Sequence, residues 1–122
     1  MKSKINAGDR SQIQWGDGNW VFLDIGFSNR GQTCGLLFGD GLPRSVQFTQ
    51  AGQMIVEQIR QSKSTINLVI EAPLSVCFDS IGNPTGRKIE KEAEKSRYWY
   101  TGAGCAVMVA AMYLIRDIYL RG

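Results

Sequence analysis

The chain has 122 residues, a hydrophobic content of 43% and a formal net charge of +3, with a pI near 8.9. This length suits a single small domain with its own hydrophobic core. The modest positive charge permits contact with nucleic acid but does not require it. The chain contains no histidine, which excludes Ser-His and Cys-His catalysis and imidazole metal sites. Carboxylates are therefore the main candidates for catalytic chemistry.

The three cysteines, Cys34, Cys77 and Cys105, lack the paired spacing of a zinc site. Their odd number favours reduced thiols and a cytoplasmic location. Residues 1–20 are polar and rich in glycine, unlike a signal peptide. We interpret residues 1–122 as one domain, with residues 1–18 as a flexible N-terminal segment.

The first candidate site residue is Asp24, near the end of an apolar strand predicted over residues 21–25. A polar turn rich in glycine follows, and then a second strand over residues 33–38. An aspartate beside such a turn directs its carboxylate to the opening, where a metal ion or a phosphate can approach the backbone. The alternative is that Asp24 only caps a hairpin turn.

The second candidate is Glu71, which ends the apolar run over residues 66–70. Ligands bind at strand ends in open sheets covered by helices, and parallel strands can be neighbours although distant in sequence. We therefore expect Asp24 and Glu71 to lie side by side. Two such carboxylates repel unless a cation or a shared proton lies between them, and oxygen ligands favour Mg²⁺ or Mn²⁺. The alternative is an ordinary pairing of Glu71 with an arginine.

Between these strands, the glycine-rich turn at residues 39–41 leads into a short third strand over residues 45–48. Thr49 is the expected N-cap of a helix over residues 50–61. Its apolar residues recur at helical spacing and predict a helix that covers the sheet. A polar loop over residues 62–65 then precedes the fourth strand.

The pattern around Asp24, Arg30, Gly35 and Glu71 resembles the RNase H-like superfamily, in particular its RuvC and YqgF resolvase branch and related predicted nucleases. The resemblance covers residues 21–74. It implies an α/β fold in which a mixed sheet, with three antiparallel strands and a parallel fourth, packs against helices. It also implies a nuclease dependent on Mg²⁺ or Mn²⁺, with Asp24 and Glu71 as catalytic metal ligands. Asp-x-Gly hairpins also open the actin, Hsp70 and sugar-kinase folds, where the turn holds a nucleotide phosphate.

Beyond residue 74 the chain departs from this family. Residues 75–85 are expected to form a loop, and residues 87–97 a charged helical stretch typical of a solvated face. Basic side chains can clamp phosphates and aromatic rings can stack on bases. The candidate nucleic-acid contacts are Arg30, Arg87, Lys88, Arg97 and Trp99. The alternative is that the aromatic residues 98–100 anchor a core or an interface.

Residues 103–120 form a helix that is apolar on most sides, so we predict that it is buried. A membrane span is the competing interpretation, but the uncharged stretch over residues 98–115 is at the lower limit of length. The resembled family carries a third acid on a late helix, which makes Asp117 the candidate third catalytic residue. Asp79 and Glu90 are further candidates for that position.

The leading hypothesis is a nuclease or nuclease-like domain that acts on phosphodiester bonds of DNA or RNA. Two-metal catalysis normally requires three or four carboxylates. The family's fifth strand has no counterpart before Gly122, so we expect a truncated fold whose apolar helix is covered by a partner. The second hypothesis is therefore a noncatalytic subunit that forms a homo-oligomer or joins a larger complex, without a membrane partner. A third, nucleotide binding in the manner of actin, requires a second lobe.

Overall fold

The structure is a computed structural model, and it describes residues 11, 15–16, 19–27, 31–72, 77–85 and 102–122. The predicted charged helical stretch over residues 87–97 and the aromatic residues 98–100 lie outside the described residues, as does most of the N-terminal segment.

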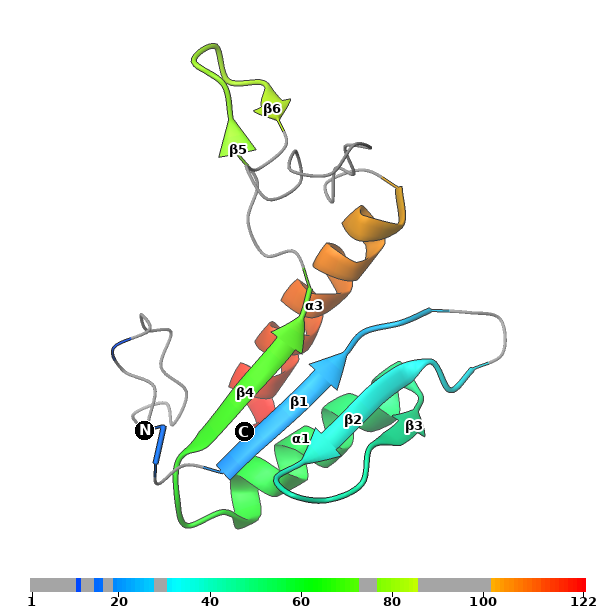
Figure 1. Ribbon diagram of the computed structural model, residues 1–122, viewed down its shortest axis with the longest axis vertical. Helices are drawn as coiled ribbons and strands as arrows, with labels where there is room; N and C mark the ends of the chain where they lie inside the picture. The colour runs from blue at the N-terminus through cyan, green and yellow to red at the C-terminus, as the bar shows by residue number, and fades with distance from the viewer. Residues whose placement is uncertain (1–10, 12–14, 17–18, 28–30, 73–76, 86–101) are drawn as a thin grey trace.

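A four-stranded mixed sheet forms the centre of the molecule (Figure 1). Its spatial order is β3-β2-β1-β4, in which β2 is antiparallel to both β1 and β3, and β4 is parallel to β1. This arrangement confirms the predicted α/β class with three antiparallel strands and a parallel fourth. The strands are β1 (Asn19–Asp24), β2 (Cys34–Phe38), β3 (Arg44–Val46) and β4 (Ile66–Glu71).

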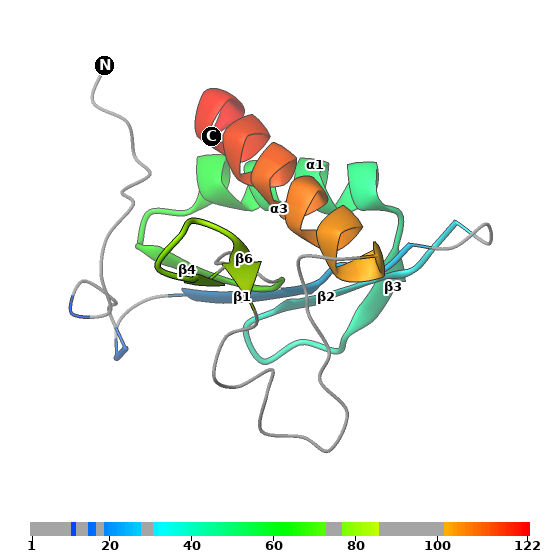
Figure 2. The same cartoon turned by 90° about the horizontal axis from the view of Figure 1, so that it is seen from above.

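Both described helices, α1 (Phe48–Gln61) and α3 (Gly102–Arg121), lie on the same face of this sheet, as Figure 2 shows. Successive side chains of a strand point to opposite faces. In β1 the buried side chains of Val21 and Leu23 therefore point to the helices, and Phe22 and Asp24 point to the other face, which we call the open face. The core lies between the sheet and the two helices.

Helix α1 begins two residues earlier than expected, at Phe48, because β3 already ends at Val46. Gln47 is then extended and occupies the N-cap position without a side-chain cap, so the prediction of Thr49 as the cap is wrong. The predicted apolar face is confirmed, since Ala51 and Ile55 are fully buried. The helix ends at Gln61, where the prediction placed its end.

Helix α3 is less buried than the sequence suggested. One side, with Ala111, Leu114 and Ile118, contributes to the core. Most of its large side chains remain exposed, because the sheet and α1 cover only one side of the helix. The exposed residues are Val109, Met112, Tyr113, Ile115, Tyr119 and Leu120. Among the described helices, none combines the length and the apolar character needed to cross a membrane.

The predicted loop over residues 75–85 contains a small hairpin of β5 (Cys77–Phe78) and β6 (Pro84–Thr85). Asp79 organises its turn, because the carboxylate accepts backbone N–H bonds from Ile81 at 3.0 Å and from Asn83 at 2.9 Å. Gly82 has a φ of 88°, which favours glycine at this position. Polar turn residues thus close a hairpin where the sequence indicated only a loop.

Candidate functional site

Asp24 and Glu71 are direct neighbours at the ends of β1 and β4. The parallel register pairs Asp24 with Glu71, immediately after Leu23 with Ile70. Neighbouring strands are about 4.8 Å apart, so the two acidic residues lie close together at the carboxyl ends of β1 and β4. Both are exposed, and both follow a residue that points to the helices, so their side chains leave the sheet on the open face. The predicted proximity of the two acids is confirmed.

The register of β1 and β4, and with it the pairing of Asp24 with Glu71, is fixed by the buried residues of the two strands. A shift of the register by one residue would turn every side chain of β4 to the other face. Leu68 and Ile70 of β4 pack against the core beside Val21 and Leu23 of β1, and the shift would expose them. The apolar residues between the strand start and the carboxylates therefore determine where the carboxylates lie.

Two glycines shape the surroundings of Asp24. A Cβ atom at Gly26 would lie 2.5 Å from the carbonyl oxygen of Thr33, so the hairpin approaches too closely for any other residue. The Thr33 hydroxyl donates to the Gly26 carbonyl and holds this approach. Gly35 is the cross-strand partner of Asp24 in β2, where an added Cβ would make only ordinary contact with the Asp24 Cβ at 3.6 Å. The space beside the carboxylate is thereby left open on the β2 side.

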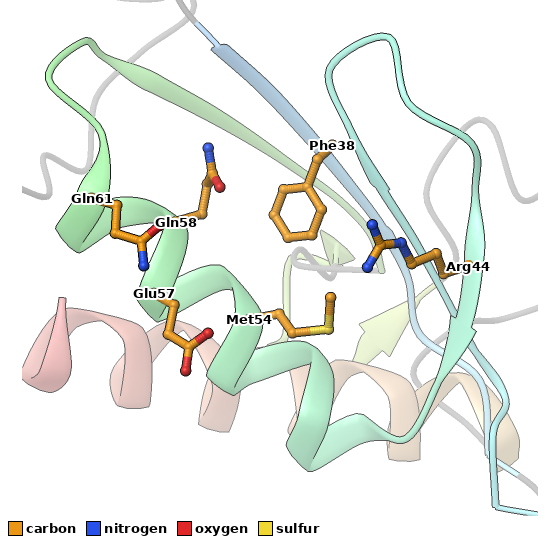
Figure 3. Close-up of a pocket in the computed structure, with 6 residues that line it drawn as sticks. All are labelled: Phe38, Arg44, Met54, Glu57, Gln58 and Gln61. Carbon is orange, nitrogen blue, oxygen red and sulfur yellow. The ribbon is translucent and has the colours of Figure 1, made fainter.

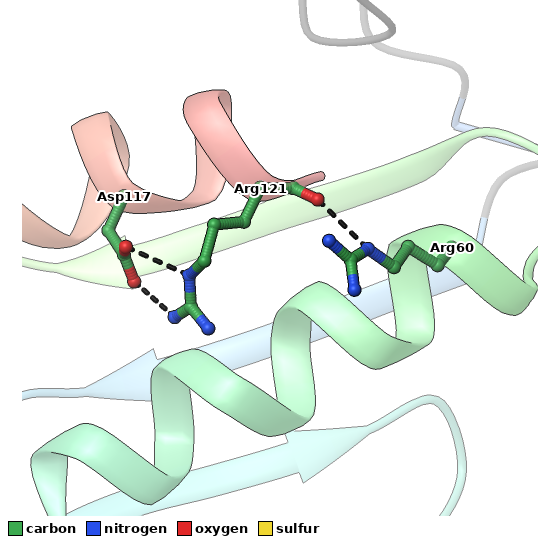
Figure 4. Close-up of polar contacts among 3 residues, drawn as sticks. All are labelled: Arg60, Asp117 and Arg121. Carbon is green, nitrogen blue, oxygen red and sulfur yellow. Dashed lines mark hydrogen bonds and ion pairs between the residues drawn. The ribbon is translucent and has the colours of Figure 1, made fainter.

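The structure does not bring Asp117 to this pair. Asp117 lies on α3, on the helix-covered side of the sheet, where its carboxylate accepts hydrogen bonds from the guanidinium of Arg121 (Figure 4). This bond raises the pKa of Arg121. The Nε of Arg60 in α1 donates to the backbone oxygen of Arg121 at 2.9 Å, which ties the end of α3 to α1. The carboxylate of Asp117 is thus engaged in an ion pair within α3, and the backbone oxygen of Arg121 makes the contact with α1.

The carboxylate of Asp79 is bound within the turn of the β5–β6 hairpin. Backbone N–H bonds from Asn83 and Ile81 hold the pKa of its carboxyl below the ordinary value of 3.8.

Within the described part of the chain, no group of three acidic, cysteine or histidine side chains could hold a metal ion. Among the described residues, Asp24 and Glu71 therefore have no third acidic, cysteine or histidine side chain grouped with them. Glu90 lies outside the described residues, as do the predicted nucleic-acid contacts Arg30, Arg87, Lys88, Arg97 and Trp99.

A row of aromatic rings leads to the carboxylate pair along the open face, and the sequence analysis missed it. The ring centroid of Trp20 lies 5.4 Å from that of Trp15 and 5.9 Å from that of Phe22. The planes of the Trp20 and Phe22 rings are 13° apart, so these two rings are stacked. Trp20, Phe22 and Asp24 alternate along β1, which places them on one face. This spacing by two residues was the available signal, but the predicted strand began at residue 21 and left Trp20 outside it.

The sheet also carries a shallow hollow on its other face, between β2, β3 and α1 (Figure 3). Its volume is about 290 Å³, and its lining residues are Phe38, Arg44, Met54, Glu57, Gln58 and Gln61. None of the predicted site residues lines it. The carboxylate pair therefore belongs to an exposed strand end and not to this hollow.

No protein-family model, curated protein or solved structure matches this chain.

Proposed function

We propose that this chain is a metal-dependent nuclease or nuclease-like domain in which Asp24 and Glu71 bind Mg²⁺ or Mn²⁺. The observation that carries the proposal is the register that pairs these two acids at the ends of adjacent parallel strands. Their oxygen atoms are ligands that suit hard divalent cations. A bound cation would relieve the repulsion between the two carboxylates.

The two side chains would share one role in this proposal, which is to hold the cation. The cation would supply activation of water and stabilisation of the leaving oxygen of a phosphodiester. Asp24 and Glu71 would orient the cation on the open face, and the absence of a side chain at Gly35 would leave room for the phosphate. The exposed position of both acids leaves coordination sites for water and substrate.

The strand topology supports the RNase H-like interpretation of the fold. Three antiparallel strands and a fourth strand parallel to β1 are the features that the resemblance implies for this part of the sheet. The acids at the ends of β1 and β4 also occupy the positions that the resemblance implies. Fold likeness alone does not establish activity, so the carboxylate pair carries the functional argument.

The aromatic row supports a nucleic-acid substrate. Base faces stack on aromatic side chains, and each such contact contributes about 1–3 kcal/mol to binding. Trp20 and Phe22 lie on the same face and the same strand as Asp24, so a strand of DNA or RNA stacked on them would pass over the carboxylates. Arg30, Arg87, Lys88, Arg97 and Trp99 stay proposed contacts with the same substrate.

A noncatalytic assembly subunit is the second candidate function. It is favoured by the exposed apolar side chains of α3 and by the presence of two, rather than three, grouped acids among the described residues. In this case the domain would keep its sheet and use its apolar surface to oligomerise or to join a larger complex.

A cleavage assay separates the two candidates. Labelled single-stranded, duplex and branched DNA and RNA are incubated with the chain in Mg²⁺ or Mn²⁺, and Asp24→Asn and Glu71→Gln are compared with the wild type. We expect both substitutions to abolish cleavage. Asp40→Asn is the matched control, because Asp40 is an exposed acid in the turn between β2 and β3 and should be dispensable.

Direct titration with Mn²⁺ completes the test. Binding that is lost in both variants, together with an absence of cleavage by the wild type, would support a noncatalytic cation-binding domain. An absence of both Mn²⁺ binding and cleavage in the folded wild type would contradict the nuclease proposal.

A further inference from the structure

The hollow between β2, β3 and α1 exists because β3 is short. Its first residue, Arg44, pairs with Leu36 of β2, so β3 does not reach the position beside Phe38. Leu42, which comes two residues before Arg44, lies outside the strand and is 86% exposed. One side of Phe38 is therefore left to the hollow, which it lines together with Met54 of α1. Both side chains are half-buried, and they give the hollow an apolar floor.

Polar side chains of α1 border the rest of the hollow. Met54, Gln58 and Gln61 follow one another at intervals of four and three residues, which places them on one flank of the helix. Glu57 lies on the same flank, three residues after Met54. A carboxamide carries both N–H donors and a carbonyl acceptor. The hollow thus offers a donor and an acceptor beside its apolar floor.

Two opposite charges border the hollow and come from different elements. Arg44 of β3 points to the helix-covered side of the sheet, as its cross-strand partner Leu36 does. Glu57 comes from α1, and in Figure 3 Phe38 and Met54 lie between the two charged groups. Among the described residues, no hydrogen bond or ion pair engages the side chain of Arg44 or of Glu57. Both charges are therefore available to a ligand.

We propose that this hollow binds a short zwitterionic peptide, of dipeptide size and with apolar side chains. The guanidinium of Arg44 pairs with the terminal carboxylate, and the carboxylate of Glu57 accepts hydrogen bonds from the terminal ammonium. The carboxamide of Gln58 matches the peptide group, which also has one N–H and one carbonyl. The apolar side chains of the ligand contact Phe38 and Met54.

The size and the charges of the hollow favour this class of ligand. Its volume of about 290 Å³ is close to the lower limit of small-molecule sites, which is about 300 Å³. A phosphate compound would suit Arg44 but would bring a like charge towards Glu57, and a polycation would do the reverse. A ligand with one charge of each sign satisfies both. Neither Asp24 nor Glu71 lines the hollow, so the proposal is independent of the proposed nuclease function.

Titration of the isotope-labelled chain with L-leucyl-L-leucine, followed by amide chemical shifts, tests the proposal. We expect saturable shifts at Phe38, Arg44 and Gln58 and a dissociation constant in the millimolar range, because the ligand is small and the hollow is shallow. The N-acetylated dipeptide lacks the ammonium, and the dipeptide amide lacks the carboxylate. Each should bind about fivefold more weakly, which is the upper limit for a partly exposed ion pair. An absence of saturable shifts, or equal affinity for the three compounds, would overturn the proposal.

Charge variants assign the two ends of the ligand. Arg44→Gln should remove the difference in affinity between the dipeptide and its amide, and Glu57→Gln the difference between the dipeptide and its acetylated form. Both residues are exposed, so the variants should fold, and their amide spectra check this. Arg116→Gln is the matched control, because Arg116 is an exposed arginine of α3 outside the hollow. An equal effect of Arg116→Gln, or tighter binding of adenosine monophosphate than of the dipeptide, would contradict the proposal.

Discussion

The two faces of the sheet use the same strands for different purposes. The helix-covered face holds the aliphatic side chains that fix the register, including Leu23 and Leu36. The open face holds an aromatic row and, at its end, two carboxylates. Neighbouring residues of β1 therefore differ in role although they share one backbone. Alternate residues of one strand thus either pack into the core and fix the register or present polar and aromatic side chains to solvent.

The largest expected effect is a loss of stability when a residue of the helix-covered face is substituted. Leu23→Ala removes a side chain that is 2% exposed and should lower the free energy of unfolding by about 2–5 kcal/mol. Phe22→Ala, one residue earlier on the open face, should cost about 1 kcal/mol, because its ring is 40% exposed. Urea unfolding followed by circular dichroism measures both. Equal losses would mean that the open face is covered in solution.

The next effect concerns binding at the open face. Trp20→Ala should weaken the affinity for single-stranded DNA by about 1–3 kcal/mol, because it removes the middle ring of the row. Tyr119→Ala is the control, because Tyr119 is an exposed aromatic residue on α3. Fluorescence anisotropy of labelled oligonucleotides in the presence of a chelator isolates stacking from cation binding. An equal loss in the two variants would contradict a role for the open face.

A smaller effect on stability distinguishes the two glycines near Asp24, Gly26 and Gly35. Gly26→Ala should destabilise the fold by about 1–3 kcal/mol, since the added Cβ meets backbone and the hairpin must move. Gly35→Ala should change stability by less than about 0.5 kcal/mol, because its Cβ makes ordinary contact. Thermal unfolding measures both variants. A large loss for Gly35→Ala would show that the space beside Asp24 is already filled.

The smallest effect is a pH dependence confined to the β5–β6 hairpin. The folded pKa of Asp79 lies below its ordinary value of 3.8. Its contribution is therefore fully present above pH 3.8 and is lost as the pH falls through the folded pKa. Amide exchange at Ile81 and Asn83 should accelerate in that acidic range, and Asp79→Ala should remove the dependence. Unchanged exchange in the variant would contradict the assignment of these bonds.

Much of this architecture could be predicted from the sequence. The apolar run ending at Glu71 and the strand containing Asp24 indicated two strand ends, and their adjacency followed from the expected parallel pairing. The role of Asp117 was also accessible, because an acid four residues before Arg121 on a helix is typical of an ion pair. The four-residue spacing of Asp117 and Arg121 was thus a better guide to the contacts of Asp117 than the catalytic acid that the resemblance implies on a late helix.

Other features depend on contacts that a single sequence does not display. The apolar residues of α3 predicted burial, but only the placement of α1 and the sheet decides which side is covered. The aromatic row escaped notice for the same reason, since Trp20 and Phe22 resemble core residues until one face of β1 is known to be uncovered. Tertiary placement, rather than local propensity, determines both features.

The parallel pairing of β1 with β4 also has a kinetic consequence. The neighbouring contact between Asn19 and Ser62 already spans 43 residues, and a loop of that size must close before the pairing forms. The hairpin of β1 and β2 requires a much shorter closure, and contacts distant along the chain slow folding. We expect β4 to dock after this hairpin. The Asp24–Glu71 pair would then form late in folding, and the cation binding that we propose would require a completely folded sheet.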